Sequence, residues 1–304
     1  MQGLKPQLRT TKKEFEHWLI SPDGLVCDVF GHLNTIFECS PEYFFRRMND
    51  AAGDSIKGDS TYYEILEEYA SSVQRTEFPW SNVYAVEKVS RGIPANSIVH
   101  LSINTAIRTM NFFELPESVR VYANIGTYGI DGCLSSFLGQ ASIIDELAFL
   151  VIGDLAFFYD MNALRIKHVK SNVRILLLNN HGGEEFYYNG MWQNEKSDLH
   201  TSARHNAEAE GWAKSCGYRY LRAEDKKSFD EALPAFLGDS DCPVLFEVFT
   251  EMSSDCQAIL DFYDKSRPHD AVSDVKRAGK DFVKRTIGKE TAVKIADKLG
   301  VKLR

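Results

Sequence analysis

The sequence lacks any apolar run long enough to cross a membrane, and it lacks a Cys-x-x-Cys pair. Its longest apolar stretch, residues 145–158, contains three acidic residues and is shorter than the roughly 20 apolar residues of a spanning helix. The first 20 residues have no apolar core of the kind that signal peptides carry. The 6 cysteines are scattered, which excludes a disulfide scaffold, disfavours a zinc knuckle and indicates reduced thiols. These absences predict a cytoplasmic protein.

Repeats and low-complexity tracts are also missing, which disfavours a solenoid or a disordered chain. No Gly-x-Gly-x-x-Gly follows a first strand, so a doubly wound nucleotide-binding protein is a weaker alternative. What the sequence does have is an ordinary globular composition, with 44% hydrophobic and 12% aromatic residues. Its 304 residues indicate two domains, at roughly 150 residues per domain.

The charge is unevenly distributed along the chain. The net charge is −8, yet residues 265–304 contain 12 basic and 5 acidic residues, a local charge of +7 that leaves −15 for residues 1–264. An acidic body argues against general nucleic-acid binding, which depends on neutralising phosphates. The basic tail has apolar residues at near-helical spacing. It is therefore predicted to be an amphipathic helix that contacts a membrane surface or an acidic partner, or that packs on its own acidic domain.

The first 96 residues predict a small fragment of helices and one strand. The expected elements are a helix over 11–19, a strand over 25–30, a helix from Pro41, a polar linker over 50–60, and helices over 62–75 and 83–90. Because one strand cannot form a sheet alone, we interpret this region as the end of a larger domain.

From residue 97 onward, strands and helices alternate. The expected strands are 97–101, 119–123, 148–152, 173–178, 219–222 and 244–248, and the expected helices are 104–111, one opening near 129–132, one following the third strand to about 169, 205–216 and 229–236. Near-continuous apolar strands predict an α/β fold with a doubly wound, mainly parallel sheet and helices on both faces. Such sheets bind ligands at the carboxyl ends of their strands.

Polar residues follow two of these strands where each strand ends. Gly153-Asp154-Leu155 follows one, and Asn179-Asn180-His181-Gly182-Gly183 follows the next, with 26 positions between Asp154 and Asn180. Right-handed crossovers place both ends at one edge of the sheet. A carboxylate, an amide oxygen and a backbone carbonyl suit Mg²⁺, and a glycine lets the backbone approach a diphosphate. Each motif alone is also typical of a plain turn, but the pair at this spacing favours a metal–diphosphate site.

These motifs resemble the fingerprint of thiamine diphosphate (ThDP) enzymes, Gly-Asp-x followed one strand–helix–strand unit later by Asn-Asn. The wider sequence is similar to the MenD family, the 2-succinyl-5-enolpyruvyl-6-hydroxy-3-cyclohexene-1-carboxylate synthases of menaquinone biosynthesis. The similarity covers about residues 97–261 and, more weakly, residues 11–48. The matching residues are Tyr122-Ala123-Asn124, Gly129-Ile130-Asp131-Gly132, Gly153-Asp154-Leu155, Tyr159-Asp160, Asn162-Ala163-Leu164 and Asn179-Asn180-His181-Gly182-Gly183 with Phe186. The resemblance implies a remnant of the family's central domain at 1–60, a helical linker at 61–96, the ThDP-diphosphate-binding (PP) domain at 97–264 and the basic helical tail at 265–304.

The resemblance also implies roles for individual residues. The Mg²⁺ ligands would be the Asp154 carboxylate, the Asn180 amide and the Gly182 carbonyl. Further cofactor-binding residues would be Gly153 and Leu155 at the diphosphate and Ile130, which props the thiazolium against the aminopyrimidine. Substrate-binding residues would be Arg108, Asn104 and Phe186, and the always-charged guanidinium suits a carboxylate. From the residues alone, Ile130 could equally belong to the core and Arg108 to a solvated helix face.

The chain departs from the family in several places. The family's activating glutamate lies in a pyrimidine-binding (Pyr) domain, and nothing in residues 1–96 resembles that domain. Without this acid its proton relay is lost, so no catalytic residue is assigned in this chain. The family's carboxylate-binding arginine is replaced at Ile125, its serine at Tyr128, and an apolar residue by Glu185. Losing a cation and gaining an anion both oppose a dicarboxylate substrate.

The resulting expectation is a ThDP- and Mg²⁺-dependent carboligase, a transferase that decarboxylates a small 2-oxo acid and adds the product to an acceptor. It would need a Pyr domain from another chain or from a missing N-terminal half, in a homo- or hetero-oligomer, and the isolated chain is expected to be inactive. The chain would be a fragment, a subunit of a split enzyme or a protein that has lost catalysis. The alternative is a non-catalytic ThDP-fold module that binds the cofactor or a partner.

Overall fold

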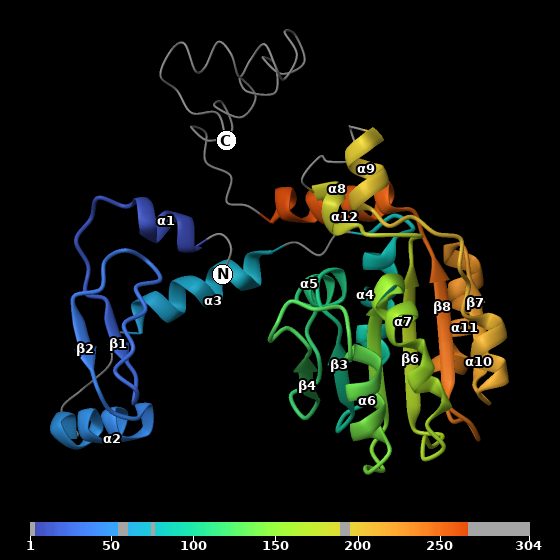
Figure 1. The fold of residues 1–304 in the computed structure, drawn as a ribbon, viewed down its shortest axis with the longest axis horizontal. Coiled ribbons are helices and arrows are strands. Elements are labelled where there is room, and N and C mark those ends of the chain that lie inside the picture. The colour runs from blue at the N-terminus through green and yellow to red at the C-terminus, as the bar shows by residue number, and fades with distance from the viewer. Residues whose placement is uncertain (1–3, 54–59, 74–76, 189–194, 267–304) are drawn as a thin grey trace, which may run out of the picture. The chain divides into compact units, whose positions relative to one another are not determined.

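The computed structural model describes residues 4–53, 60–73, 77–188 and 195–266, and the chain divides into two compact units between Ser72 and Val73 (Figure 1). Of the predicted basic tail at 265–304, all but the first two residues lie outside the described residues, as does much of the predicted linker at 50–60. Within the described ranges, no helix is both long and apolar enough to span a membrane.

The first unit contains a pair of short parallel strands. Its elements are α1 (Leu4–Thr10), β1 (Trp18–Ile20), β2 (Thr35–Phe37), α2 (Pro41–Ala52) and α3 (Thr61–Ser72). Trp18 of β1 lies edge-on to Phe37 of β2, with 5.4 Å between the ring centroids, and Phe37 packs against Phe44 of α2 at 4.7 Å. Helix α2 begins at Pro41, as predicted, and the Ser40 side chain caps it.

Two predictions in the first unit are wrong. Residues 11–19 do not form a helix, because the last of them pair in parallel with β2, and this pairing overrides the helical spacing of the apolar residues. Residues 25–30 do not form a strand. The Asp28 carboxylate accepts three backbone N–H groups that follow it, and these bonds fold the segment into a loop; the donors are Gly31, His32 and Leu33.

The second unit contains a six-stranded sheet in the order β4-β3-β5-β6-β8-β7 (Figure 1). The strands are β3 (Ile98–Leu101), β4 (Arg120–Ala123), β5 (Ala148–Gly153), β6 (Val173–Asn179), β7 (Arg219–Ala223) and β8 (Val244–Phe249). Every neighbouring pair is parallel, which confirms the predicted doubly wound α/β fold. The chain leaves β3 for β4 on one side and continues to β5 on the other, so the strand order reverses between β3 and β5.

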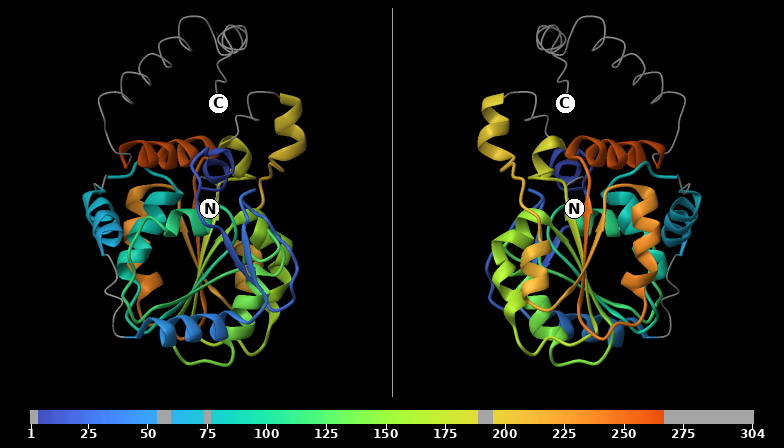
Figure 2. Two further views of the ribbon diagram at one scale, coloured as in Figure 1. Left: turned by 90° about the vertical axis from the view of Figure 1, so that its left-hand side faces the viewer. Right: turned by 90° about the vertical axis from the view of Figure 1, so that its right-hand side faces the viewer.

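Helices cover both faces of this sheet (Figure 2). The helices of the second unit are α4 (Asn82–Gly92), α5 (Thr105–Met110), α6 (Cys133–Ala141), α7 (Asp154–Asp160), α8 (Glu185–Tyr188), α9 (Glu195–Thr201), α10 (Glu210–Ser215), α11 (Lys226–Leu237) and α12 (Met252–Lys265), with a 3-10 turn at Met161–Arg165. Of these, α8 and α9 lie beyond the carboxyl ends of the strands rather than against a face (Figure 1). Along β5, Phe149 and Val151 pack in one core with α4, α11 and α12, and Leu150 and Ile152 pack in a second core with α6, α7 and α10. This alternation places two hydrophobic layers around one buried sheet.

Two helix boundaries differ from the prediction. The helix after β5 ends at Asp160 rather than at residue 169, and only a 3-10 turn follows, because the Asp160 carboxylate is tied to Ser135 of α6. The helix predicted over 205–216 begins only at Glu210. The backbone N–H groups before it are used in the loop instead, since His205, Ala207 and Ala209 donate to partners outside a helix.

The two units divide the predicted helical linker at 61–96. Helix α3 belongs to the first unit, whereas α4 belongs to the core of the second, where Val83, Ala85 and Val86 are fully buried. The interpretation of the first unit as a central-domain remnant and of the second as a PP domain stays a prediction.

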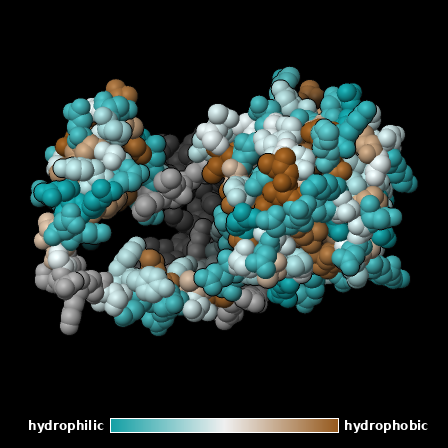
Figure 3. Space-filling model, turned by 90° about the horizontal axis from the view of Figure 1, so that it is seen from below, coloured by the Kyte–Doolittle hydropathy of each residue, from teal (hydrophilic) through white to brown (hydrophobic). Residues whose placement is uncertain are grey.

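The surface is mostly polar on the face shown in Figure 3, where hydrophobic residues form small, separate patches. All 6 cysteines are free thiols, as the sequence predicts.

Candidate functional site

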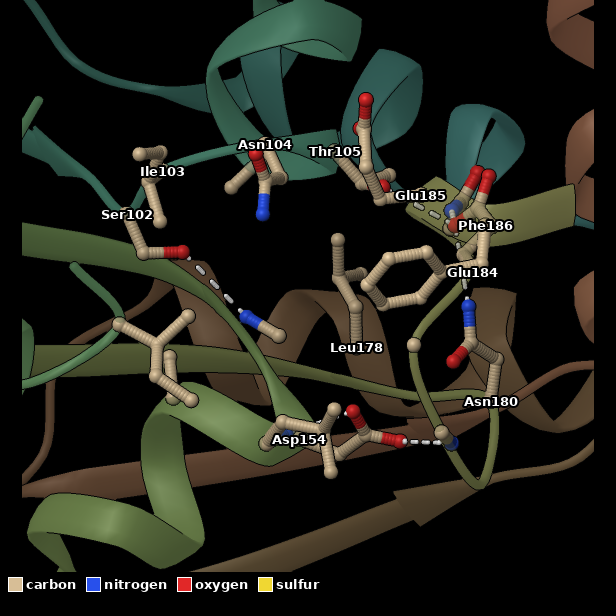
Figure 4. Close-up of a pocket in the computed structure, with 18 residues that line it drawn as sticks. Ser102, Ile103, Asn104, Thr105, Asp154, Leu178, Asn180, Glu184, Glu185 and Phe186 are labelled. Atoms are coloured by element: carbon tan, nitrogen blue, oxygen red, sulfur yellow. Dashed lines mark hydrogen bonds between the residues drawn. The ribbon is translucent and has the colours of Figure 1, made fainter. Parts of the chain in front are cut away.

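A cavity of about 270 Å³ lies at the carboxyl ends of β3, β5 and β6, where the strand order reverses. The residues that line it are Asn82, 102–106, Ile130, 153–156, Leu178, Asn180 and 182–186. Figure 4 shows Asp154 and Asn180 on one side and Asn104 and Thr105 on the other, with Phe186 between them. Parallel α/β sheets bind ligands at this position, so the cavity is the candidate site.

The cavity brings together most of the predicted site residues. All the predicted cofactor-binding residues line it, namely Ile130, Gly153, Asp154, Leu155, Asn180 and Gly182. Two predicted substrate-binding residues, Asn104 and Phe186, line it as well. The third, Arg108, is not among the described lining residues. It forms an ion pair with Glu185, and Glu185 does line the cavity. The ligand roles of all these residues stay predictions.

Asp154 is the first residue of α7, and only 3% of its surface is exposed. Its Oδ2 accepts the N–H of Gly182 at 3.0 Å, and its Oδ1 accepts the N–H of Leu155 at 2.6 Å. The first of these bonds ties the loop after β6 to the end of β5. The two motifs therefore meet at one edge of the sheet, as their spacing predicts.

Two carboxylates hold the amide group of Asn180 in one orientation. Its Nδ2 donates to Glu184 Oε2 at 3.0 Å and to Asp255 Oδ2 at 3.2 Å. Because both donors of the amide are engaged, its oxygen points the other way, and Figure 4 shows that oxygen on the side of Asp154. A metal-binding amide needs this kind of outer support.

Asp255, in α12, is fully buried beneath the site. Its Oδ1 accepts the N–H of Asn82 at 2.7 Å, and its Oδ2 also accepts the Thr250 hydroxyl at 2.6 Å. Burial, with a smaller contribution from the charge of Asp154, raises the pKa of Asp255 to about 7. The motifs around residues 153–183 give no sign of Asp255, which lies 173 positions from its partner Asn82.

Glu184 is a second buried acid that sequence reasoning missed. Its Oε2 accepts the Asn82 amide at 2.7 Å, the Thr105 hydroxyl at 3.1 Å and the Asn180 amide. Its place directly after Gly183 in the motif loop was a usable signal. The Asn82 amide oxygen has no hydrogen-bond partner within the described part of the chain, so an acceptor is left in the cavity wall.

His205 faces the carboxylate of Asp154. Its Nδ1 accepts the N–H of Ala207 at 3.1 Å, so the proton of the neutral ring lies on Nε2. This Nε2 is 3.2 Å from Asp154 Oδ2, although the angle is not that of a hydrogen bond. The contact shields one oxygen of Asp154 on the side of the loop before α10.

Asn104 has a strained backbone at the edge of the cavity. Its φ of 68° and ψ of −119° are unfavourable for any residue with a side chain. Such strain persists where the surrounding structure holds it, commonly at functional sites. The substrate-binding role of Asn104 itself stays a prediction.

The residues of the cavity fit a Mg²⁺–diphosphate group. A Cβ added at Gly153 would meet no atom within 4 Å, so the backbone there is open to a ligand. Asp154 and Asn180 offer a carboxylate and an oriented amide oxygen, which are hard ligands. The Gly182 carbonyl accepts the N–H of Glu184 at 3.2 Å and keeps a second lone pair. The described residues contain no cluster of three or more His, Cys, Asp or Glu side chains suited to a metal. The predicted ligand set includes only one such side chain, that of Asp154, because its other ligands are an amide oxygen and a backbone carbonyl.

Asn179, the first asparagine of the motif, has a structural role. Its Nδ2 donates to Glu247 Oε1 at 2.7 Å and to the carbonyl of Ala207 at 3.0 Å, and its Oδ1 accepts the N–H of His181 at 3.2 Å. Glu247, in the buried strand β8, also accepts the Tyr220 hydroxyl at 2.8 Å. Glu247 therefore holds the end of β6 and the loop before α10 together.

We expect Glu247 to make stability depend on pH. Burial raises the pKa of Glu247 above its usual 4.5, so the folded protein keeps a proton that the unfolded chain releases. Its stabilising contribution is complete below 4.5 and is lost as the pH rises through the folded pKa, by up to about 1.4 kcal/mol per pH unit. Urea unfolding at pH values above 4.5 should show this decline in the wild type and a shallower decline in Glu247→Gln, in which the buried Asp255 still contributes. The exposed control Glu231→Gln should keep the decline, and equal slopes in all three proteins would refute the assignment.

No protein-family model matches the chain. It is 39% identical over 252 residues to the 2-succinyl-5-enolpyruvyl-6-hydroxy-3-cyclohexene-1-carboxylate synthase of Bacteroides fragilis, a match that covers 82% of this chain and 45% of that protein. Proteins of the same name from Bacteroides thetaiotaomicron and Phocaeicola vulgatus are 36% and 33% identical over 251 and 252 residues, covering 82% of this chain and 45% and 44% of their own lengths. The chain thus spans less than half the length of the curated relatives it matches.

Proposed function

The chain is MenD-like and corresponds to the C-terminal part of such a protein, and on this premise we propose that it is the ThDP- and Mg²⁺-binding portion of a carboligase that decarboxylates a small 2-oxo acid. The observation that carries the proposal is the meeting of Asp154, the oriented amide of Asn180 and the open backbone of Gly153 in one cavity. When bound, ThDP supplies the electron sink that lets a 2-oxo acid lose CO₂.

Each lining residue has a proposed task. Asp154, Asn180 and the Gly182 carbonyl would hold Mg²⁺, and Gly153 and Leu155 would border the diphosphate. Ile130 would support the cofactor rings, and Asn104 and Phe186 would enclose the substrate. The hydrogen bonds from Asn180 to Glu184 and Asp255 would keep the amide oxygen directed at the metal.

The proposed enzyme also needs a chain or segment that supplies the activating glutamate. The second unit has an exposed apolar edge that supports such a partner. Every residue of β4, the edge strand, is exposed, and in the loop after it Ile125 and Tyr128 are 45% and 81% exposed. Exposed edge strands and apolar side chains favour protein association. A Pyr-domain-bearing chain or N-terminal half would cover this edge in a homo- or hetero-oligomer.

The decisive experiment measures binding first and turnover second. ThDP is titrated into the purified chain by calorimetry with and without Mg²⁺. The chain is then mixed with the N-terminal half of the Bacteroides fragilis relative, and CO₂ release is assayed from a panel of 2-oxo acids. We expect Mg²⁺-dependent binding, and turnover only with the partner. Binding without turnover would favour the non-catalytic module, and no Mg²⁺-dependent binding even with the partner would overturn the cofactor assignment.

A further inference from the structure

We infer that Glu185 closes Arg108 to substrate carboxylates, so that the site takes a 2-oxo monocarboxylic acid whose side chain is uncharged or cationic. This rests on the proposed function, because it names the substrate class of the same cavity. The observation that carries it is the ion pair between the two residues.

The ion pair joins two elements that border the cavity. Arg108 belongs to α5, which follows β3, and Glu185 begins α8, which follows β6. Arg108 Nη1 donates to Glu185 Oε2 at 2.8 Å, and the two side chains are only 23% and 30% exposed. A charge-assisted bond of this length, partly shielded from water, is stronger than a typical surface ion pair. A carboxylate of the chain itself therefore occupies Arg108 before any substrate arrives.

The charge of the cavity wall points the same way. Among the described residues that line it, the charged side chains are all acidic: Asp154, Glu184 and Glu185. Asp154 is assigned to the metal, and Glu184 is held by hydrogen bonds from other lining residues. Ile125, which stands where the family carries an arginine, is not among the described lining residues and would supply no charge in any case. This part of the wall would repel a second substrate carboxylate rather than bind it.

A dicarboxylate that bound Arg108 would have to share the guanidinium with Glu185 or displace that carboxylate. In either case the carboxylate of Glu185 stays tethered in the same wall, close to the incoming one, and like charges repel strongly at such distances. The carboxylate that leaves as CO₂ is a separate group and does not need Arg108. The discrimination therefore concerns the far end of the substrate, where the apolar side chains of Ile103, Ala106 and Phe186 suit an uncharged group.

The test measures anion binding to the full chain without cofactor, with glutarate as the dicarboxylate probe and glutaramide as the neutral one. Glu185→Gln keeps the size of the side chain and removes its charge. By calorimetry it should bind glutarate at least about 10-fold more tightly than the wild type does. The double variant Arg108→Gln/Glu185→Gln should lose this gain. Glu146→Gln, which breaks an exposed ion pair with Arg120 away from the cavity, should leave glutarate binding unchanged.

Equal glutarate affinity in the wild type and Glu185→Gln would overturn the inference. If Glu185→Gln does not fold, the wild type alone decides. If the wild type binds glutarate more weakly than glutaramide, the inference is supported. If it binds glutarate as tightly as glutaramide or more tightly, the inference is overturned. Failure of the proposed function would appear elsewhere, in the Mg²⁺-dependent titration of ThDP, in which no dicarboxylate is present.

Discussion

Replacing Asp154 by Asn should weaken Mg²⁺-dependent binding of ThDP by more than about 100-fold, since the loss of an outer-shell partner alone typically costs 10- to 100-fold. Asp154 is the single carboxylate in the predicted ligand set, and it is almost fully buried. Asparagine has the same shape. Its single oxygen can still accept the N–H of Gly182, so the loop after β6 should stay in place, while the local bond from the N–H of Leu155 is lost. The effect would therefore report the lost charge at the metal rather than a change of fold.

The matched control is Asp145→Asn, which makes the same substitution at a side chain that is 96% exposed and pairs with Lys170. Its ThDP affinity should equal that of the wild type. Calorimetric titrations of ThDP at saturating and zero Mg²⁺ separate the two variants. An Asp154→Asn chain that binds ThDP within a few-fold of the wild type, with the same need for Mg²⁺, would remove Asp154 from the metal site.

The core of the second unit was predictable because its central strands are near-continuous apolar runs. The run Val173–Asn179 is buried at every position, and only a central strand covered on both faces buries all of its side chains. Strand order and crossover handedness then bring Asp154 and Asn180 together with no further information. The cavity at the carboxyl ends of the strands follows from the topology.

The second layer of the site was not predictable in this way. Asp255 and Glu184 both accept hydrogen bonds from Asn180, and both also accept hydrogen bonds from Asn82. Asn82 lies 173 and 102 positions from these two acids. The position of Glu184 in the motif loop indicates that it lies near the site, but no local pattern indicates its partners or those of Asp255. The pairing of Arg108 with Glu185, 77 positions apart, is of the same kind. The charges of a site are visible in sequence, but their partners depend on the tertiary structure.

The errors in the first unit have a different cause. Short segments there fold through side-chain-to-backbone bonds and a two-stranded pairing, which compete with hydrophobic periodicity. Asp28 alone bonds three backbone N–H groups and so removes the predicted strand. Periodicity is a weak guide where a segment buries little surface, and Leu25 and Val26 are 70% and 69% exposed.

The two glycines of the motifs should respond to alanine in opposite ways. At Gly182, which has a φ of +159°, an added Cβ would lie 2.6 Å from the backbone oxygen of Ser202, so the backbone must move. Gly182→Ala should therefore lower the free energy of unfolding by about 2–3 kcal/mol. At Gly153 the φ of −78° suits alanine and no atom lies within 4 Å of the added Cβ. Gly153→Ala should change stability by less than about 1 kcal/mol.

Ligand binding completes the contrast between the two variants. The new methyl group of Gly153→Ala would enter the space assigned to the diphosphate, so we expect ThDP affinity to fall about 10-fold in a chain of normal stability. Thermal unfolding and calorimetry of both variants measure the two quantities separately. A Gly153→Ala chain with wild-type affinity would show that the diphosphate does not lie against this backbone. A Gly182→Ala chain of wild-type stability would show that the loop after β6 can move without a loss of stability. The Gly182 carbonyl could then not be a rigidly held third metal ligand.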